Sequence, residues 1–88
     1  MKKINMTPKE IQKLVDNYPA KYEDGLTDAE IKDITSKIPN INMDKVYDAL
    51  YGNTCMMIDN NIINYHHDVS LAITCGVQNR DINAEEWD

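Results

Sequence analysis

The same helix-start pattern occurs twice in the first third of the chain. Residues 6–11 and 26–31 each place a threonine, Thr7 or Thr27, three residues before a glutamate and between two apolar residues. In such a capping box the threonine hydroxyl and the glutamate carboxylate accept hydrogen bonds from backbone N–H groups that have no partner within the helix. The two apolar residues that flank the box pack against each other. Residues 41–46 repeat the cap and the apolar pair without the glutamate. These patterns predict three helices.

Prolines, glycines and apolar spacing set the expected bounds of these helices. The first should run from Pro8 to residue 17 or 18, because Pro19 follows, and the second from Asp28 to about residue 37, before Pro39. The residues between them, 19–25, are expected to form a loop. The third helix should span residues 43–51, followed by a glycine at the position that favours positive φ.

A β-hairpin is expected after the third helix. Two short apolar runs flank an Asp-Asn-Asn sequence at residues 59–61, which tolerates the positive φ angles of a tight turn. A loop made of the two asparagines would pair Ile58 with Ile63 and Met56 with Tyr65, which places four apolar side chains on one face. A lone hairpin is marginal in water, so this face should cover the helices.

A short fourth helix is expected after the hairpin, from a cap at Asp68 to a stop at Gly76. The sequence therefore predicts a mostly helical α+β fold with three N-terminal helices, a β-hairpin and a short fourth helix. Eighty-eight residues fit one domain, and its ends, residues 1–6 and 83–88, are the parts that we expect to fray.

Three helices followed by a hairpin are also the order of elements in winged-helix domains, and residues 8–66 resemble that order. The resemblance implies that the third helix would enter the major groove of DNA and that the hairpin would form the wing. A transcriptional regulator that binds DNA directly is therefore one alternative. The charges oppose it, because the outer face of the third helix offers Lys45 beside Asp44 and Asp48, and the hairpin turn has no Lys or Arg.

Charge divides the chain into two unequal parts. The net charge is −6, of which residues 1–21 contribute +3 and residues 22–88 contribute −9. Such a surface repels the phosphate backbone, so direct nucleic-acid binding is not expected, and it favours a protein partner with a basic surface. No apolar run is long enough for a membrane span and no signal-peptide pattern is present, so we expect a cytoplasmic location.

The residues expected to bind this partner are mostly acidic or aromatic. The apolar stripe of the third helix leaves its opposite face to solvent, and the tail adds two glutamates and the only tryptophan. The predicted set is Asp44, Lys45, Asp48, Tyr51, Glu85, Glu86 and Trp87. Aromatic anchors among acidic residues suit docking onto a basic protein. We therefore expect a non-enzymatic binding module, similar in style to small viral proteins that inhibit or modulate host proteins; the sequence leaves open whether it forms a homo-oligomer.

Four residues, Cys55, His66, His67 and Cys75, are of types that ligate zinc, and the expected hairpin places Cys55 across from His66. Their spacing lacks both Cys-x-x-Cys and His-x₃₋₅-His, so no metal or cofactor is expected, and a small metal-binding domain is a second alternative. Catalysis is not expected either, because neither a nucleophile motif nor a glycine-rich phosphate loop is present.

Overall fold

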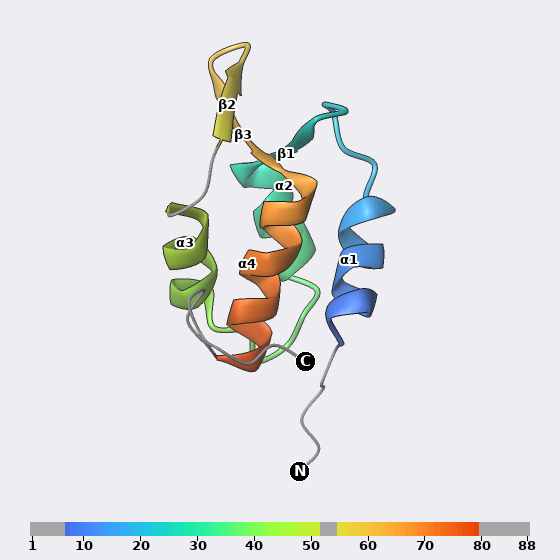
Figure 1. Ribbon diagram of the computed structural model, residues 1–88, viewed down its shortest axis with the longest axis vertical. Coiled ribbons are helices and arrows are strands. Elements are labelled where there is room, and N and C mark those ends of the chain that lie inside the picture. The colour runs from blue at the N-terminus through green and yellow to red at the C-terminus, as the bar shows by residue number, and fades with distance from the viewer. Residues whose placement is uncertain (1–6, 52–54, 80–88) are drawn as a thin grey trace.

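The computed structural model describes residues 7–51 and 55–79. Within these residues the protein is a small α+β domain with four helices and a three-stranded antiparallel sheet (Figure 1). The elements follow the order α1 (Pro8–Asp16), β1 (Gly25–Thr27), α2 (Asp28–Thr35), α3 (Met43–Tyr51), β2 (Cys55–Ile58), β3 (Asn61–Tyr65) and α4 (His66–Gln78). The predicted mostly helical α+β class is therefore confirmed. No helix in the described part of the chain is long and apolar enough to cross a membrane.

Helix α4 is the centre of the helical layer. It packs between α1 and α3, and the hairpin of β2 and β3 extends beyond the helices at one end (Figure 1). Its sequence contains no Lys or Arg, and most of its length is buried. A helix that is apolar over so much of its surface must be covered on several sides, which explains why α4 has helices on both flanks.

Both capping boxes form as predicted. The Thr7 and Thr27 hydroxyls accept hydrogen bonds from the N–H groups of Glu10 and Glu30, and each glutamate carboxylate accepts the threonine N–H in return. The third cap forms as well, because the Asn42 side chain accepts the N–H of Asp44 at 3.1 Å. The sequence therefore located all three N-terminal helix starts.

The first two helices are shorter than predicted, and the third has the predicted bounds. Helix α1 ends at Asp16 and α2 at Thr35, each followed by a turn before the proline. Each proline thus comes after the turn that follows its helix. The regular helical hydrogen bonding stops two or more residues before the proline. Ile38 is buried although it lies outside α2. The glycine predicted to stop α3, Gly52, lies outside the described residues.

A strand replaces the end of the expected loop between α1 and α2. Strand β1 pairs antiparallel with β3, with Gly25 opposite Tyr65 and Thr27 opposite Ile63, so the sheet order is β1-β3-β2. Three residues are too few for an alternating pattern to be visible in the sequence. A Cβ atom on Gly25 would collide with the backbone carbonyl of Asn64, so the strand requires glycine there.

The predicted hairpin register is wrong by two residues, although its faces are right. The loop consists of Asp59 and Asn60, with φ angles of 52° and 66°, so that Ile58 pairs with Asn61 and Met56 pairs with Ile63. Two consecutive residues with positive φ form the type of turn that matches the strand twist. Because side chains alternate with period two, a shift of two keeps the same residues on each face.

The predicted bounds of α4 are corrected at both ends. The helix begins at His66, directly after β3, and its stop is Asn79, which has a φ of 56°. Gly76 lies inside the helix, where α3 approaches. A Cβ atom there would collide with the Val46 side chain and lie 2.9 Å from the carbonyl oxygen of Asn42. The glycine therefore serves helix packing and not helix termination.

Replacing Gly76 with Ala should destabilise the protein by about 1–3 kcal/mol, because α3 must move away from α4. Helix propensity alone predicts the opposite sign, a gain of roughly 1 kcal/mol. Chemical denaturation measures the difference, with the exposed substitution Gln12→Ala in α1 as the control. A stabilised Gly76→Ala variant would contradict the close approach of the two helices.

Candidate protein-binding surface

The outer face of α3 carries the predicted partner-binding residues of this helix. Asp44, Asp48 and Tyr51 are all exposed, and Tyr51 is 86% exposed, the largest value among the large apolar and aromatic side chains of the described residues. They occur at intervals of four and three residues, so they form one stripe along the helix. Lys45 is half-buried beside this stripe. The stripe faces solvent because the opposite positions of α3 are buried in the core.

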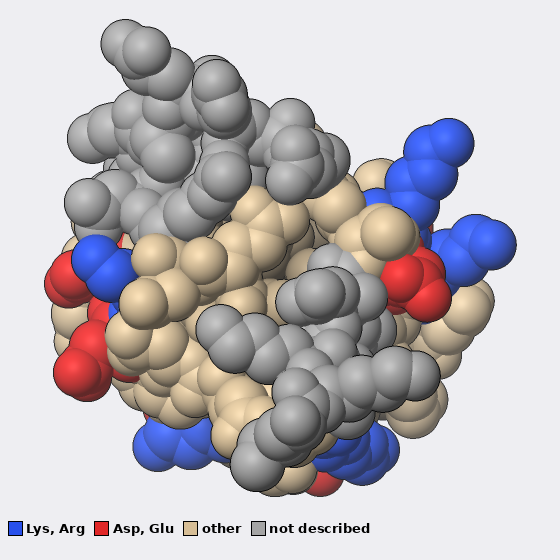
Figure 2. All heavy atoms as spheres, turned by 90° about the horizontal axis from the view of Figure 1, so that it is seen from below, with Lys and Arg blue, Asp and Glu red and all other residues tan. Residues whose placement is uncertain are grey.

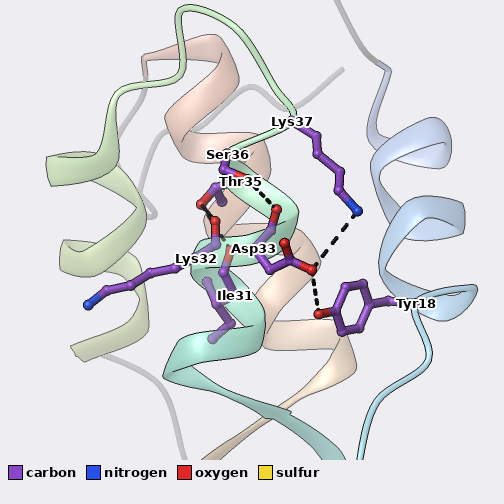
Figure 3. Close-up of polar contacts among 7 residues, drawn as sticks. All are labelled: Tyr18, Ile31, Lys32, Asp33, Thr35, Ser36 and Lys37. Carbon is purple, nitrogen blue, oxygen red and sulfur yellow. Dashed lines mark hydrogen bonds and ion pairs between the residues drawn. The ribbon is translucent and has the colours of Figure 1, made fainter.

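The carboxylates of α2 are held by partners within the protein. Asp28 forms an ion pair with Lys32 at 3.3 Å. Asp33 accepts a 2.7 Å hydrogen bond from the Tyr18 hydroxyl and lies 4.0 Å from the Lys37 ammonium (Figure 3). Each acidic residue of α2 therefore has a neighbouring donor or cation, since the Glu30 carboxylate accepts the N–H groups of Lys21 and Thr27. The negative charge of α2 is largely balanced on the protein itself.

The carboxylates of α3 differ from those of α2. Within residues 7–51 and 55–79, the side chains of Asp44 and Asp48 have no ion pair and no hydrogen bond. Exposed carboxylates one helical turn apart, without internal cations, attract positive charge from outside the molecule. The stripe of Asp44, Asp48 and Tyr51 therefore presents two unpaired carboxylates beside an exposed tyrosine.

The Tyr18 hydrogen bond links α1 to α2 and has a measurable pH dependence. The bond to Asp33, with some burial, raises the pKa of Tyr18 to about 12. An unfolded tyrosine ionises near pH 10, so this contribution to stability is complete below about pH 10 and is lost as the pH rises to about 12.

The thermal midpoint of Tyr18→Phe should therefore lie below that of the wild type at pH values under about 10. The two midpoints should converge by about pH 12. Tyr51→Phe, at an exposed position, is the matched control and should follow the wild type throughout. A constant difference in thermal midpoint between Tyr18→Phe and the wild type across this range would show that the Asp33 carboxylate does not raise the pKa of Tyr18.

The outer face of the hairpin is a second exposed surface, which the sequence analysis did not single out. Met57 and Ile62 pair across the strands and are 67% and 54% exposed, with Cys55 exposed beside them. The turn presents Asp59, whose carboxylate accepts a 3.2 Å hydrogen bond from the Tyr22 hydroxyl. Residues 55–65 contain no Lys or Arg. The alternation of the apolar run could have indicated this face, since every second residue points away from the core.

The remaining predicted residues fall in two groups. Glu85, Glu86 and Trp87 lie outside the described residues. The expected opposition of Cys55 and His66 is wrong, because Cys55 pairs with Asn64 and His66 begins α4. In the described ranges no three His, Cys, Asp or Glu side chains lie together as metal ligands.

The end of the helical layer that lies away from the hairpin has a different character (Figure 1). Charged side chains lie at the rim of the visible surface there, and the visible middle is uncharged (Figure 2). The connection between α2 and α3 and the C-terminal end of α4 are found at this end (Figure 1).

Comparison with known protein families, curated proteins and solved structures gives no match for this chain.

Proposed function

We propose that this protein is a non-enzymatic binding module that docks onto a basic surface of another protein. The observation that carries the proposal is the contrast between α2, whose carboxylates are paired, and α3, where Asp44 and Asp48 face solvent beside Tyr51. Complementary charge speeds association and fixes orientation, while an exposed tyrosine supplies contact area at little cost in conformational entropy. Lys45, at the edge of this stripe, belongs to the proposed surface.

The partner suggested by this charge pattern is a nucleic-acid-handling protein, because such proteins carry basic surfaces that bind phosphates. An acidic protein that occupies such a surface competes with nucleic acid and so inhibits or modulates the partner. Small viral proteins that act on host proteins are similar in their compact, acidic character, and we propose a role of the same kind for this chain. The acidic and aromatic tail, Glu85, Glu86 and Trp87, would extend the same chemistry.

A winged-helix-like regulator that binds DNA directly is the second candidate. The observation in its favour is the sheet order β1-β3-β2, with β1 placed between the first two helices and the hairpin projecting beyond them (Figure 1). In that arrangement α3 would enter the major groove. Asp44 and Asp48 would then face phosphates, and the hairpin offers no Lys or Arg among residues 55–65 to hold the backbone. Charge therefore ranks this candidate below protein binding, and a metal-binding role has still less support.

Two measurements distinguish these functions. The purified chain should not retard duplex DNA at low salt, where nonspecific binding is strongest. From the cells in which the protein acts, it should capture a basic protein, and Asp44→Asn/Asp48→Asn should lose that protein. Glu23→Gln/Asp24→Asn, which removes the same charge from an exposed loop, should retain it. A salt-sensitive shift of DNA by the wild type would favour the winged-helix regulator.

A further inference from the structure

A groove of about 440 Å³ lies between the C-terminal half of α2 and the start of α3. Its polar side is formed by Lys32 and Thr35 of α2 and by Ser36, the residue that follows this helix. Its apolar side is formed from the connection and from α3 by Ile38, Ile41, Met43 and Tyr47. It exists because α3 packs closely on α4, whereas α2 and α3 approach each other less closely. It is an open depression on the surface and not an enclosed cavity.

The apolar wall of the groove adjoins the acidic stripe of α3. Met43 and Tyr47 line the groove, and each is followed directly by one of the exposed carboxylates, Asp44 and Asp48. Consecutive residues of an α-helix are rotated by about 100°, so the two pairs lie on neighbouring faces of one helix. A partner segment in the groove would therefore have carboxylates along one of its sides.

The opposite wall, formed from α2, contains a cation that is paired within the protein. Lys32 extends from α2 toward α3 (Figure 3), and its ammonium is 3.3 Å from the Asp28 carboxylate. That bond raises the pKa of Lys32, so the side chain stays cationic, although Asp28 balances its charge. The groove thus has an apolar α3 wall that borders the carboxylates of Asp44 and Asp48, and an α2 wall whose cation is paired with Asp28.

We propose that this groove takes the apolar face of an amphipathic basic helix of the partner, with the Lys or Arg residues of that helix along the α3 wall. This inference rests on the proposed function and names the element of the basic protein that is recognised. A helix laid in a groove buries apolar side chains at three- and four-residue intervals. Cations beside such a stripe would reach Asp44 and Asp48, whose carboxylates have no partner among the described residues.

The probe is a fluorescent peptide with Leu at every third or fourth position and Lys elsewhere. The control is a peptide of the same composition in which Leu and Lys are not segregated. Ser36→Trp fills the groove without changing any residue of α3, and Ser36→Ala controls for the hydrogen bond that the Ser36 hydroxyl donates to the Asp33 carbonyl. Binding is read by anisotropy, and its location by amide chemical shifts.

The helical probe should shift amides of residues 32–47, and Ser36→Trp should weaken binding by about 10-fold or more, against less than about 2-fold for Ser36→Ala. Met43→Gln, which removes apolar surface from the other wall, gives an independent reading if Trp disturbs the fold. Equal binding of the two peptides would overturn the proposal. So would a chain that is dimeric alone and becomes monomeric with Ser36→Trp, since a second copy would then occupy the groove.

The proposal and the function on which it rests can fail separately. If Asp44→Asn/Asp48→Asn weakens the probe while Ser36→Trp and Met43→Gln do not, the groove is overturned and the acidic stripe stands. If the groove variants weaken the probe while Asp44→Asn/Asp48→Asn does not, the α3 wall is overturned and with it the proposed function. Loss of binding in both sets of variants supports both.

Discussion

Replacing Ile63 with Asp should abolish folding. Ile63 lies in the central strand of the sheet, is 0% exposed, and pairs with Thr27 on one side and Met56 on the other. The substitution removes apolar burial and places a carboxylate in a fully buried position, which costs at least about 3–5 kcal/mol. Domains of this size have total stabilities near the lower end of roughly 5–15 kcal/mol, so little folded protein should remain.

The neighbouring residue provides a matched control for this prediction. Ile62 is in the same strand, one residue earlier, and is 54% exposed because its side chain points to the opposite face. Ile62→Asp introduces the same charge and should change the free energy of unfolding by less than about 1 kcal/mol. Circular dichroism during denaturation compares them. An equal loss in the free energy of unfolding of Ile63→Asp and Ile62→Asp would mean that the faces of the hairpin are assigned wrongly.

Replacing Ile34 with Ala should cost about 2–5 kcal/mol, since it leaves a cavity in the core. Ile34 is 1% exposed on the inner face of α2, and Leu50, on the inner face of α3, should respond similarly. The control is Met57→Ala, because Met57 is 67% exposed and its truncation should stay within about 0.5 kcal/mol. Chemical denaturation gives the three values. Losses below about 0.5 kcal/mol at both core positions would contradict the helix faces.

Local signals predicted those features of the fold that local chemistry determines. The hydroxyls of Thr7 and Thr27 fix two helix starts within four residues of sequence, so the capping boxes were visible without any tertiary information. The exposure of Asp44, Asp48 and Tyr51 followed from the apolar stripe on the other side of α3. These are properties of single elements.

The features that the sequence did not reveal depend on contacts between elements. Strand β1 exists because β3 offers it an edge, and three residues carry no periodicity of their own. Gly76 has the appearance of a helix stop, and only the approach of α3 shows that it is a packing position. The groove is likewise a space between α2 and α3, to which neither helix pattern points alone.

The central claim, that α3 presents its carboxylates to a basic partner, is tested most directly by titrating the captured partner with three forms of the chain. Calorimetry should show that Asp44→Asn/Asp48→Asn weakens binding by about 10-fold or more and reduces its salt dependence. Glu23→Gln/Asp24→Asn, with the same net charge, should weaken binding by less than about 3-fold, because rim charges act mainly on the association rate. If both double variants lose affinity equally, net charge alone attracts the partner, and the α3 surface is not its binding site.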